Sequence, residues 1–459
     1  MICNLAELKK IFNIIPDKKD SSISIEGIST DTRTINNNEV FLAIKGDHFD
    51  GHSFVNIAVR IGAVAIIVEE DFDITKYNYK NFIKVKDTIR AYGDIARFYR
   101  QKSNFIVVAV TGSCGKTTTK DMVASVLSKK YKVEKTFQNN NNEIGLPFTI
   151  LNANSKTEIL VLEMGMRAIG EIEYLTKVAM PNIGIITNIG IAHIGELGSQ
   201  DNIMHAKGEL LENLSENAVA IINGEDGFTD SLKKKFSGKI KIFGFSENAD
   251  IKALNIIDTG KTTQVDIVSD NIKCRSQLNF KGIHLILDSL IAIETGRILG
   301  IDIKDSIEAL NNMEVSPGRL EIIEKNNFTI INDTYNANPD SMKKSIEVLL
   351  GFEGSKIAVL GDMRELGEEE ILYHEDMGIF LSNKGLKALI TVGRLGEYIG
   401  SGLKKSNIDN TAIYSYMNNE DAAIKLKELI SLNDIILIKG SRAMAMEEII
   451  KIIEKETVV

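Results

Sequence analysis

The sequence has few cysteines, no long apolar run and no excess of positive charge, and each absence excludes a class of protein. Its three cysteines, Cys3, Cys114 and Cys274, are too widely separated for a disulfide framework or a metal-binding spacing. Such usage is typical of the reducing cytoplasm. No apolar run approaches the roughly 18 residues of a membrane-spanning helix. The net charge of −9 gives no indication of a nucleic-acid partner.

Three catalytic patterns are missing as well. The chain has no Gly-x-Ser-x-Gly elbow, no Cys/His nucleophile pair and no His-Glu-x-x-His motif. At the N-terminus, Glu7, Lys9 and Lys10 lie among Leu5 and Leu8, which predicts an amphipathic helix rather than a signal peptide. A length of 459 residues predicts two to four domains.

Residues 105–119 have the order of strand, glycine loop and helix that a phosphate-binding loop requires. Residues 105–110 are a β-branched apolar run, and apolar residues recur at helical spacing after the loop. Glycines let backbone amides approach phosphate oxygens, and the helix start adds unpaired N–H groups. Lys116 can neutralise phosphate charge, and Thr117 can bind Mg²⁺. The alternative is a tight turn with a solvated lysine, which leaves this order of residues unexplained.

Short apolar strands alternate with helical segments along the chain, which predicts an α/β protein with three domains. We expect a small N-terminal α/β module over residues 1–84 and a central P-loop ATPase-like module with a parallel sheet over 85–312. A Rossmann-like C-terminal module should follow over 313–459. The stretch 246–280 alternates with period two, which predicts a β-rich edge hairpin. Ligands bind at the carboxyl ends of parallel strands, so functional residues should follow strands.

Two central residues are candidates on these grounds, and a third, Lys207, is not. Glu163 ends a strand and could hold Mg²⁺ opposite the phosphate loop. His193 follows the next strand, and a neutral imidazole there could bind a second metal, although a lone loop histidine is more often structural. Lys207 lies on a helical run, where a lysine is usually solvated, and its neighbours give no reason to expect otherwise.

Polar loops follow strands in the other two modules. In the C-terminal module the runs 332–341, 361–367 and 439–442 follow strands and should face one cleft. The first run could equally be a turn with a helix cap at Ser341. Thr32 and Arg33 could hold a phosphate or a uracil edge, but a polar turn with a solvated arginine explains them as well. From these residues alone we expect an Mg-ATP-dependent kinase or ligase.

Several longer motifs together resemble the Mur ligases of peptidoglycan synthesis over essentially the whole chain. The phosphate loop TGSCGKTT is shared with folylpolyglutamate synthetases and indicates only the superfamily. Within the family, the pattern is similar to the member that adds D-alanyl-D-alanine to UDP-N-acetylmuramoyl-tripeptide, and it lacks the DNPR-like signature of the member that adds the third residue. The more specific motifs are residues 31–33 with FDGHSF, 142–147, 163–165, TNIGIAHIGELGS, 206–209 and DTYNANPDSM.

The resemblance implies an ATP-dependent amide ligase that works through an acyl phosphate in the cytoplasm. Its cofactors would be ATP, two Mg²⁺ ions and a CO₂-derived carbamate on Lys207, and its partners UDP-N-acetylmuramoyl-tripeptide and D-alanyl-D-alanine. We expect a monomer. The implied catalytic residues are Lys116, Lys207, His193 and Arg319. The nucleotide would contact Gly112, Ser113, Cys114, Gly115, Lys116, Thr117, Thr118, Asp288, Arg319 and Asp333, and metal would be bound by Thr117, Glu163, His193 and carbamylated Lys207. The uridine-linked substrate would contact Thr32, Arg33 and Asn142, and the dipeptide would contact Asn336, Asn338 and Ser341.

Two positions depart from the family pattern. Leu285 stands where a polar residue is usual, and Asp288 stands where an asparagine near adenine is usual. An aspartate has no amide N–H to donate to a base nitrogen, so we expect altered or weaker adenine contacts. The alternatives are a sister Mur ligase adding one amino acid, a folate-polyglutamylating enzyme, a non-ligating nucleotide-binding paralogue and a small-molecule kinase.

Overall fold

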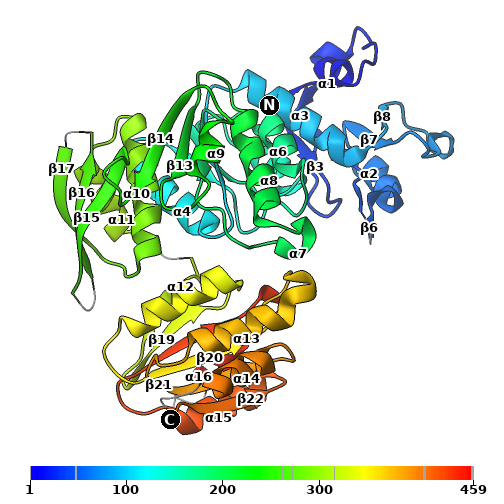
Figure 1. Ribbon diagram of the computed structural model, residues 1–459. Helices are drawn as coiled ribbons and strands as arrows, with labels where there is room; N and C mark the ends of the chain where they lie inside the picture. The colour runs from blue at the N-terminus through cyan, green and yellow to red at the C-terminus, as the bar shows by residue number, and fades with distance from the viewer. Residues whose placement is uncertain are drawn as a thin grey trace.

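The computed structural model describes residues 2–46, 49–259, 262–270, 272–314, 316–406 and 410–455. Within them, three α/β units follow one another, each built around its own sheet (Figure 1). The N-terminal unit has a four-stranded parallel sheet in the order β3-β4-β7-β8. Its main elements are α1 (Leu5–Ile11), β3 (Gly27–Ser29), β4 (Glu39–Leu42), α2 (Val55–Ile61), β7 (Ala65–Glu69) and β8 (Phe82–Val85), with short pairs β1 (Cys3–Asn4) with β2 (Ser24–Ile25) and β5 (Lys45–Gly46) with β6 (Phe49–Asp50).

The first helix forms where the sequence predicts it. The Asn4 side chain accepts a hydrogen bond from Glu7 N, and the Glu7 carboxylate accepts one from Asn4 N, so the two residues form a capping box. Leu5 and Leu8 are buried, while Lys10 on the other face is exposed. The amphipathic helix is therefore confirmed.

The central unit has a nine-stranded sheet in the order β10-β11-β9-β12-β13-β14-β15-β16-β17. The first seven strands are parallel, and β15 to β17 continue the sheet as an antiparallel extension, as the alternation over 246–280 predicts. The sheet is thus mixed rather than wholly parallel. The strands are β9 (Ile106–Thr111), β10 (Val133–Lys135), β11 (Ile159–Glu163), β12 (Ile183–Ile186), β13 (Val219–Asn223), β14 (Lys239–Gly244), β15 (Ile251–Asp258), β16 (Thr263–Ser269) and β17 (Ile272–Leu278).

Helices cover both faces of the parallel part of this sheet. Along β9, Val107 and Ala109 are buried with the helices of one face, and Val108 and Val110 with those of the other. A strand buried on both sides needs this continuous apolar run. The first face carries α3 (Thr88–Lys102), α5 (Gly145–Leu151), α6 (Glu171–Ala179) and α8 (Gln200–Glu212), and the second α4 (Lys116–Leu127), α10 (Ile283–Ile298) and α11 (Ile303–Asn311); α7 (Ile194–Leu197) and α9 (Thr229–Lys233) are short.

The C-terminal unit has a six-stranded sheet in the order β18-β19-β23-β20-β21-β22, parallel except for β18. Its α12 and the loop before α13 face the central unit (Figure 1). No helix of the described residues is long and apolar enough to cross a membrane. The elements are β18 (Glu321–Glu324), β19 (Phe328–Asp333), α12 (Pro339–Leu350), β20 (Lys356–Gly361), α13 (Glu370–Phe380), β21 (Leu386–Val392), α14 (Gly396–Ser406), β22 (Ala412–Tyr416), α15 (Asn419–Leu429), β23 (Asp434–Lys439) and α16 (Glu447–Lys455).

Candidate active site

A cavity of about 610 Å³ lies between the central and C-terminal units. The phosphate loop after β9 lines its central side. Three loops line its C-terminal side, after β19, β20 and β23, and these are the three polar loops predicted to face one cleft. The sequence-predicted residues on its wall are Ser113, Cys114, Gly115, Lys116, Thr117, Thr118, Asn142, Glu163, His193, Asp288, Arg319, Asp333, Asn336, Asn338 and Ser341.

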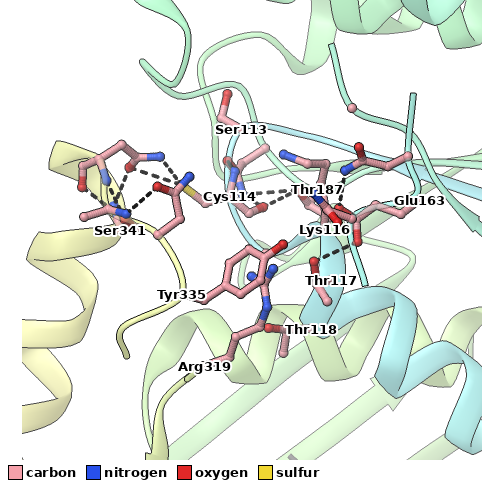
Figure 2. A pocket seen from close by; sticks show the side chains of 18 of the residues that line it. Ser113, Cys114, Lys116, Thr117, Thr118, Glu163, Thr187, Arg319, Tyr335 and Ser341 are labelled. Atoms are coloured by element: carbon pink, nitrogen blue, oxygen red, sulfur yellow. Dashed lines mark hydrogen bonds between the residues drawn. The ribbon is translucent and has the colours of Figure 1, made fainter. Parts of the chain in front are cut away.

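The phosphate loop is held in shape by its neighbours. Gly112 has φ +151° and Gly115 has φ +81°, and a Cβ at Gly112 would lie 1.9 Å from Thr187 Oγ1. The loop therefore requires glycine at Gly112 for space as well as for backbone conformation. Lys116 Nζ donates to Gly112 O at 2.8 Å. Figure 2 shows the bond from Thr187 Oγ1 to Cys114 O, which is 2.6 Å long. Burial lowers the pKa of Lys116, and the Glu163 carboxylate partly offsets this.

A buried carboxylate lies beside the first turn of α4. Thr117 Oγ1 donates to Glu163 Oε2 at 2.7 Å (Figure 2), and Asn141 Nδ2 donates to Glu163 Oε1 at 2.9 Å. Glu163 itself is 3 % exposed. A carboxylate and a hydroxyl in hydrogen-bond contact supply the hard oxygen ligands that Mg²⁺ prefers. These residues therefore fit a magnesium ion bound next to the phosphate loop.

His193 lies across the cleft from the C-terminal unit. It has φ +66°, and its Nδ1 lies 3.1 Å from Glu365 Oε2. The nearby His193 imidazole lowers the pKa of Glu365. Among the described residues, His193, Glu196 and Glu365 bring ligand atoms within 4.8 Å of one another, and Glu163 is outside this group. His193 can offer a nitrogen ligand, but here its nearest carboxylate belongs to the C-terminal unit.

Lys207 is buried in α8 behind the cleft wall and is not one of the residues that line the cavity. Its side chain is 1 % exposed, and it has no hydrogen bond or ion pair to any residue that the structure describes. Burial lowers the pKa of the Lys207 amine well below its usual value, and the charge of Lys116 lowers it further. A neutral amine is the form that adds to CO₂, so the residue fits the carbamate implied by the resemblance. The expectation of a solvated lysine is wrong, because α8 packs this face against the sheet.

On the opposite wall, α12 begins at the polar loop after β19. Asn338 caps the helix by accepting from Ser341 N at 2.8 Å, and Ser341 Oγ accepts from Asn338 N at 3.0 Å. The cap is therefore Asn338 rather than Ser341, which fills the third helical position. The Arg319 guanidinium carbon lies 3.8 Å from the centre of the Tyr335 ring (Figure 2). Cys114 Sγ lies 3.5 Å from the Asn338 side chain, so the two walls touch.

Comparisons with known proteins identify the family. Three family profiles match the chain. The profile of the Mur ligase family catalytic domain matches residues 24–100, that of the Mur ligase middle domain matches residues 110–296, and that of the Mur ligase glutamate ligase domain matches residues 318–442. The UDP-N-acetylmuramoyl-tripeptide–D-alanyl-D-alanine ligase of Bacillus subtilis strain 168 is 37 % identical over 451 residues, 98 % of this chain and 97 % of the relative. The chain belongs to the Mur ligase family.

Solved structures of Mur ligases superpose on nearly the whole chain. MurF from Acinetobacter baumannii has a TM-score of 0.89 at 30 % identity, and the match covers 99 % of both chains. MurF ligase from Thermotoga maritima, solved in complex with ADP, has a TM-score of 0.84 at 32 % identity over 94 % of this chain and 97 % of that one. The three-unit α/β architecture is therefore that of a Mur ligase, an ATP-dependent family that forms amide bonds.

Two further groups of predicted residues lie away from the cavity of this Mur ligase. Gly112 is buried behind the phosphate loop, where it accepts from Lys116. Thr32 and Arg33 lie in the N-terminal unit, and the Arg33 side chain is 87 % exposed. Its guanidinium contacts the Asp31 carboxylate at 2.6 Å, so its partner is two residues away in the same turn.

Some residues of the Mur ligase cleft had no predicted role. Asn141 and Thr187 hold Glu163 and the phosphate loop in place, as described above. Lys439 Nζ bonds Asp333 Oδ2 and also donates to Asn336 O at 2.9 Å. Only Lys439 had a signal in the sequence, because it follows the apolar run 435–438 and begins the polar run 439–442. Asn141 and Thr187 act by hydrogen bonds to other residues of the site, and such supporting side chains have no recognisable sequence pattern.

Asp288 lies on α10 at the back of the cavity and is 6 % exposed. Its Oδ1 accepts from Thr119 Oγ1 at 2.9 Å. Burial raises the pKa of this carboxyl to about 7, because an ionised group loses hydration there. Asp288 in this Mur ligase therefore takes up a proton more readily than an exposed aspartate, and its neutral form has an O–H donor.

Proposed function

We propose that this Mur ligase joins D-alanyl-D-alanine to UDP-N-acetylmuramoyl-tripeptide at the expense of ATP, the reaction that names its full-length bacterial relatives. The observation that supports it best is one cavity shared by the phosphate loop and the polar start of α12. A ligase needs both, because a phosphorylated carboxylate must meet an amine before water reaches it. The product would be the pentapeptide precursor of peptidoglycan.

The three units divide the substrates in this proposal. Residues 1–84 would bind the uridine diphosphate moiety, with Thr32 and Arg33 beside it, and residues 85–312 would bind ATP. Residues 313–459 would bind the incoming dipeptide through Asn336, Asn338 and Ser341. Asn142 lies on the central wall of the cavity, where the tripeptide end would enter. We expect the protein to act as a cytoplasmic monomer.

Charge neutralisation is the main task of the side chains in the proposed reaction. The C-terminal carboxylate of the tripeptide attacks the γ-phosphorus of ATP, which gives an acyl phosphate and ADP. The dipeptide amine then attacks the acyl carbon, loses a proton, and phosphate leaves. Both reactants of the first step are anions, so Lys116, the loop amides and Arg319 would lower their repulsion. Asp333 would orient the nucleotide from the C-terminal side.

Magnesium and the carbamate would be held by residues of the central unit. Thr117 and Glu163 would hold one Mg²⁺, and His193 with carbamylated Lys207 would hold a second. When bound, these ions polarise the transferred phosphoryl group and offset its charge. His193 contacts Glu365 through Nδ1, so Nε2 would be the nitrogen that binds the metal, with the Glu365 carboxylate orienting the ring from the C-terminal unit.

Phosphate release from ATP tests the proposal. The purified chain is given Mg-ATP and UDP-N-acetylmuramoyl-tripeptide, with and without D-alanyl-D-alanine. Release that requires the dipeptide, with a pentapeptide product by mass spectrometry, is the expected result. Release only with a single amino acid and a shorter precursor, or a phosphorylated product with no amide bond, would overturn it.

A further inference from the structure

The cavity that receives ATP holds a carboxyl group directly against the phosphate loop. A Cβ built on Gly115 would lie 3.0 Å from Asp288 Oδ1 and 3.2 Å from Oδ2, so both oxygens face this loop glycine. The Asp288 side chain is buried and lines the cavity. Its only hydrogen bond within the described residues comes from the Thr119 hydroxyl. No Lys or Arg nitrogen of the described residues lies within 4.0 Å of it.

The charged groups around Asp288 leave its negative charge uncompensated. From α12, the Lys344 ammonium favours the ionised form, but its effect is weaker than that of burial. Lys116 from α4 is bonded to Gly112 O. His284, one turn earlier on α10, is neutral, because burial lowers its pKa to about 3. The cations of β14 and the end of α10, Lys241 and Arg297, pair instead with Glu294.

An ionised Asp288 and a nucleotide polyphosphate are both negatively charged and repel each other. The loop amides must point at phosphate oxygens, and a carboxylate against Gly115 adds negative charge at the same loop. In a poorly solvated cavity such repulsion is screened far less than at the surface. A neutral Asp288 removes the repulsion and keeps an O–H donor that faces the cavity.

We propose that this Mur ligase binds nucleotide in the form in which Asp288 is neutral, so that nucleotide binding takes up a proton from solvent onto the Asp288 carboxylate. The proposal rests on the proposed nucleotide site at residues 112–118. It also makes Asp288 a chemical substitute for an amide: the neutral acid has one donor and one acceptor oxygen, as asparagine has one donor and one acceptor group.

The direction of the pH effect follows from linkage. If only the neutral form binds, the nucleotide Kd is constant well below the pKa of Asp288 and rises as pH passes above it. With a pKa of about 7 the Kd rises about eightfold between pH 7.5 and 8.5. Asp288→Asn cannot ionise, so its Kd lacks this increase. The ratio of the two Kd values cancels pH effects on the nucleotide itself.

Isothermal titration calorimetry with Mg-ADP tests the proposal. Kd is measured for wild type and Asp288→Asn at pH 6.5, 7.5 and 8.5, each in two buffers of different ionisation enthalpy. We expect the wild-type to Asp288→Asn ratio to rise about eightfold from pH 7.5 to 8.5. The difference in binding enthalpy between the two buffers gives the number of protons taken up. At pH 8.5 we expect wild type to take up nearly one proton more per bound nucleotide than Asp288→Asn.

Glu294→Gln is the matched control. Glu294 lies on the same helix, is 1 % exposed and also has its pKa raised by burial, but it does not line the cavity. This variant should keep the wild-type pH dependence. A constant ratio, or equal proton uptake in wild type and Asp288→Asn, would overturn the proposal. If Asp288→Asn does not fold, the wild-type measurement is sufficient by itself, because absence of proton uptake in wild type overturns the proposal.

Failure of the nucleotide site itself has a different signature. If Lys116→Ala binds Mg-ADP as tightly as wild type, the nucleotide binds elsewhere, and both the proposed nucleotide site and the proton uptake at Asp288 are overturned. If Lys116→Ala binds Mg-ADP more weakly, as expected, but the ratio of wild-type to Asp288→Asn Kd does not change with pH, only the proton uptake is overturned.

Discussion

The phosphate loop and the turn at Thr32 and Arg33 carry similar residues in opposite surroundings. Lys116 is partly buried and bonded to Gly112 O, within a loop that Thr187 and its own glycines hold in place. Arg33 is 87 % exposed and bonded to Asp31. The first region is pre-organised for an anion, so binding there costs little ordering. The second would have to exchange a local, solvent-screened ion pair for a ligand.

Removing the Lys116 charge should have the largest effect. Lys116→Ala is expected to lower kcat by about 10³-fold or more, because the γ-phosphoryl charge loses its fixed positive partner in a poorly solvated cleft. The phosphate-release assay measures it, and circular dichroism checks the fold. Lys129→Ala, an exposed lysine just after the same helix, should act as wild type. Wild-type turnover in Lys116→Ala would contradict the site.

Glu163→Gln tests whether the buried carboxylate beside the loop acts through a metal. The amide keeps the size and can still accept from Thr117, but it lacks the charge that attracts Mg²⁺. We expect about a 100-fold lower kcat at fixed Mg²⁺, with a higher Mg²⁺ concentration needed for half-maximal rate. An unchanged magnesium dependence would instead indicate a purely structural glutamate.

Arg319→Ala extends the comparison to a cation on the other wall of the cavity. Its guanidinium lies over the Tyr335 ring and is held less tightly than Lys116, since it has no hydrogen bond to the described residues. A charge-assisted contact to ATP of about 1.5–3 kcal/mol predicts a roughly 10- to 100-fold loss of kcat/KM for ATP. Arg394→Ala, an exposed arginine of the same unit, is the control. Equal kinetics for the two variants would exclude this role.

The sequence was most informative where function depends on a local pattern. The strand, loop and helix around Lys116 are contiguous, so their spacing alone predicts a phosphate site. Glu163 and the loop after β19 were predicted because parallel strands bring their carboxyl ends to one edge. The antiparallel extension was predicted from period-two alternation, and the mixed character of the whole sheet follows from it.

Other properties depend on packing and could not be predicted from local residues. Lys207 is surrounded by polar and small neighbours in the chain, yet α8 buries it, and only the family resemblance indicated a special role. Asp288 was expected to weaken or alter adenine contacts because an aspartate has no amide N–H to donate. Its burial raises its pKa to about 7, and this burial depends on packing between α4 and α10, where Asp288 contacts Thr119, 169 residues away in the sequence.

Arg33→Ala tests the exposed turn and should have the smallest effect. An exposed arginine already paired with Asp31 gains little when it changes partner, so we expect KM for the uridine-linked substrate to rise about fivefold, with kcat and the Mg-ADP Kd unchanged. Added salt should reduce the difference, because both partners are solvated. Arg60→Ala on α2 is the control in the same unit. A loss of kcat as large as in Lys116→Ala would show that the N-terminal turn is part of the catalytic cleft after domain movement, and the contrast between a pre-organised and a ligand-ordered region would fail.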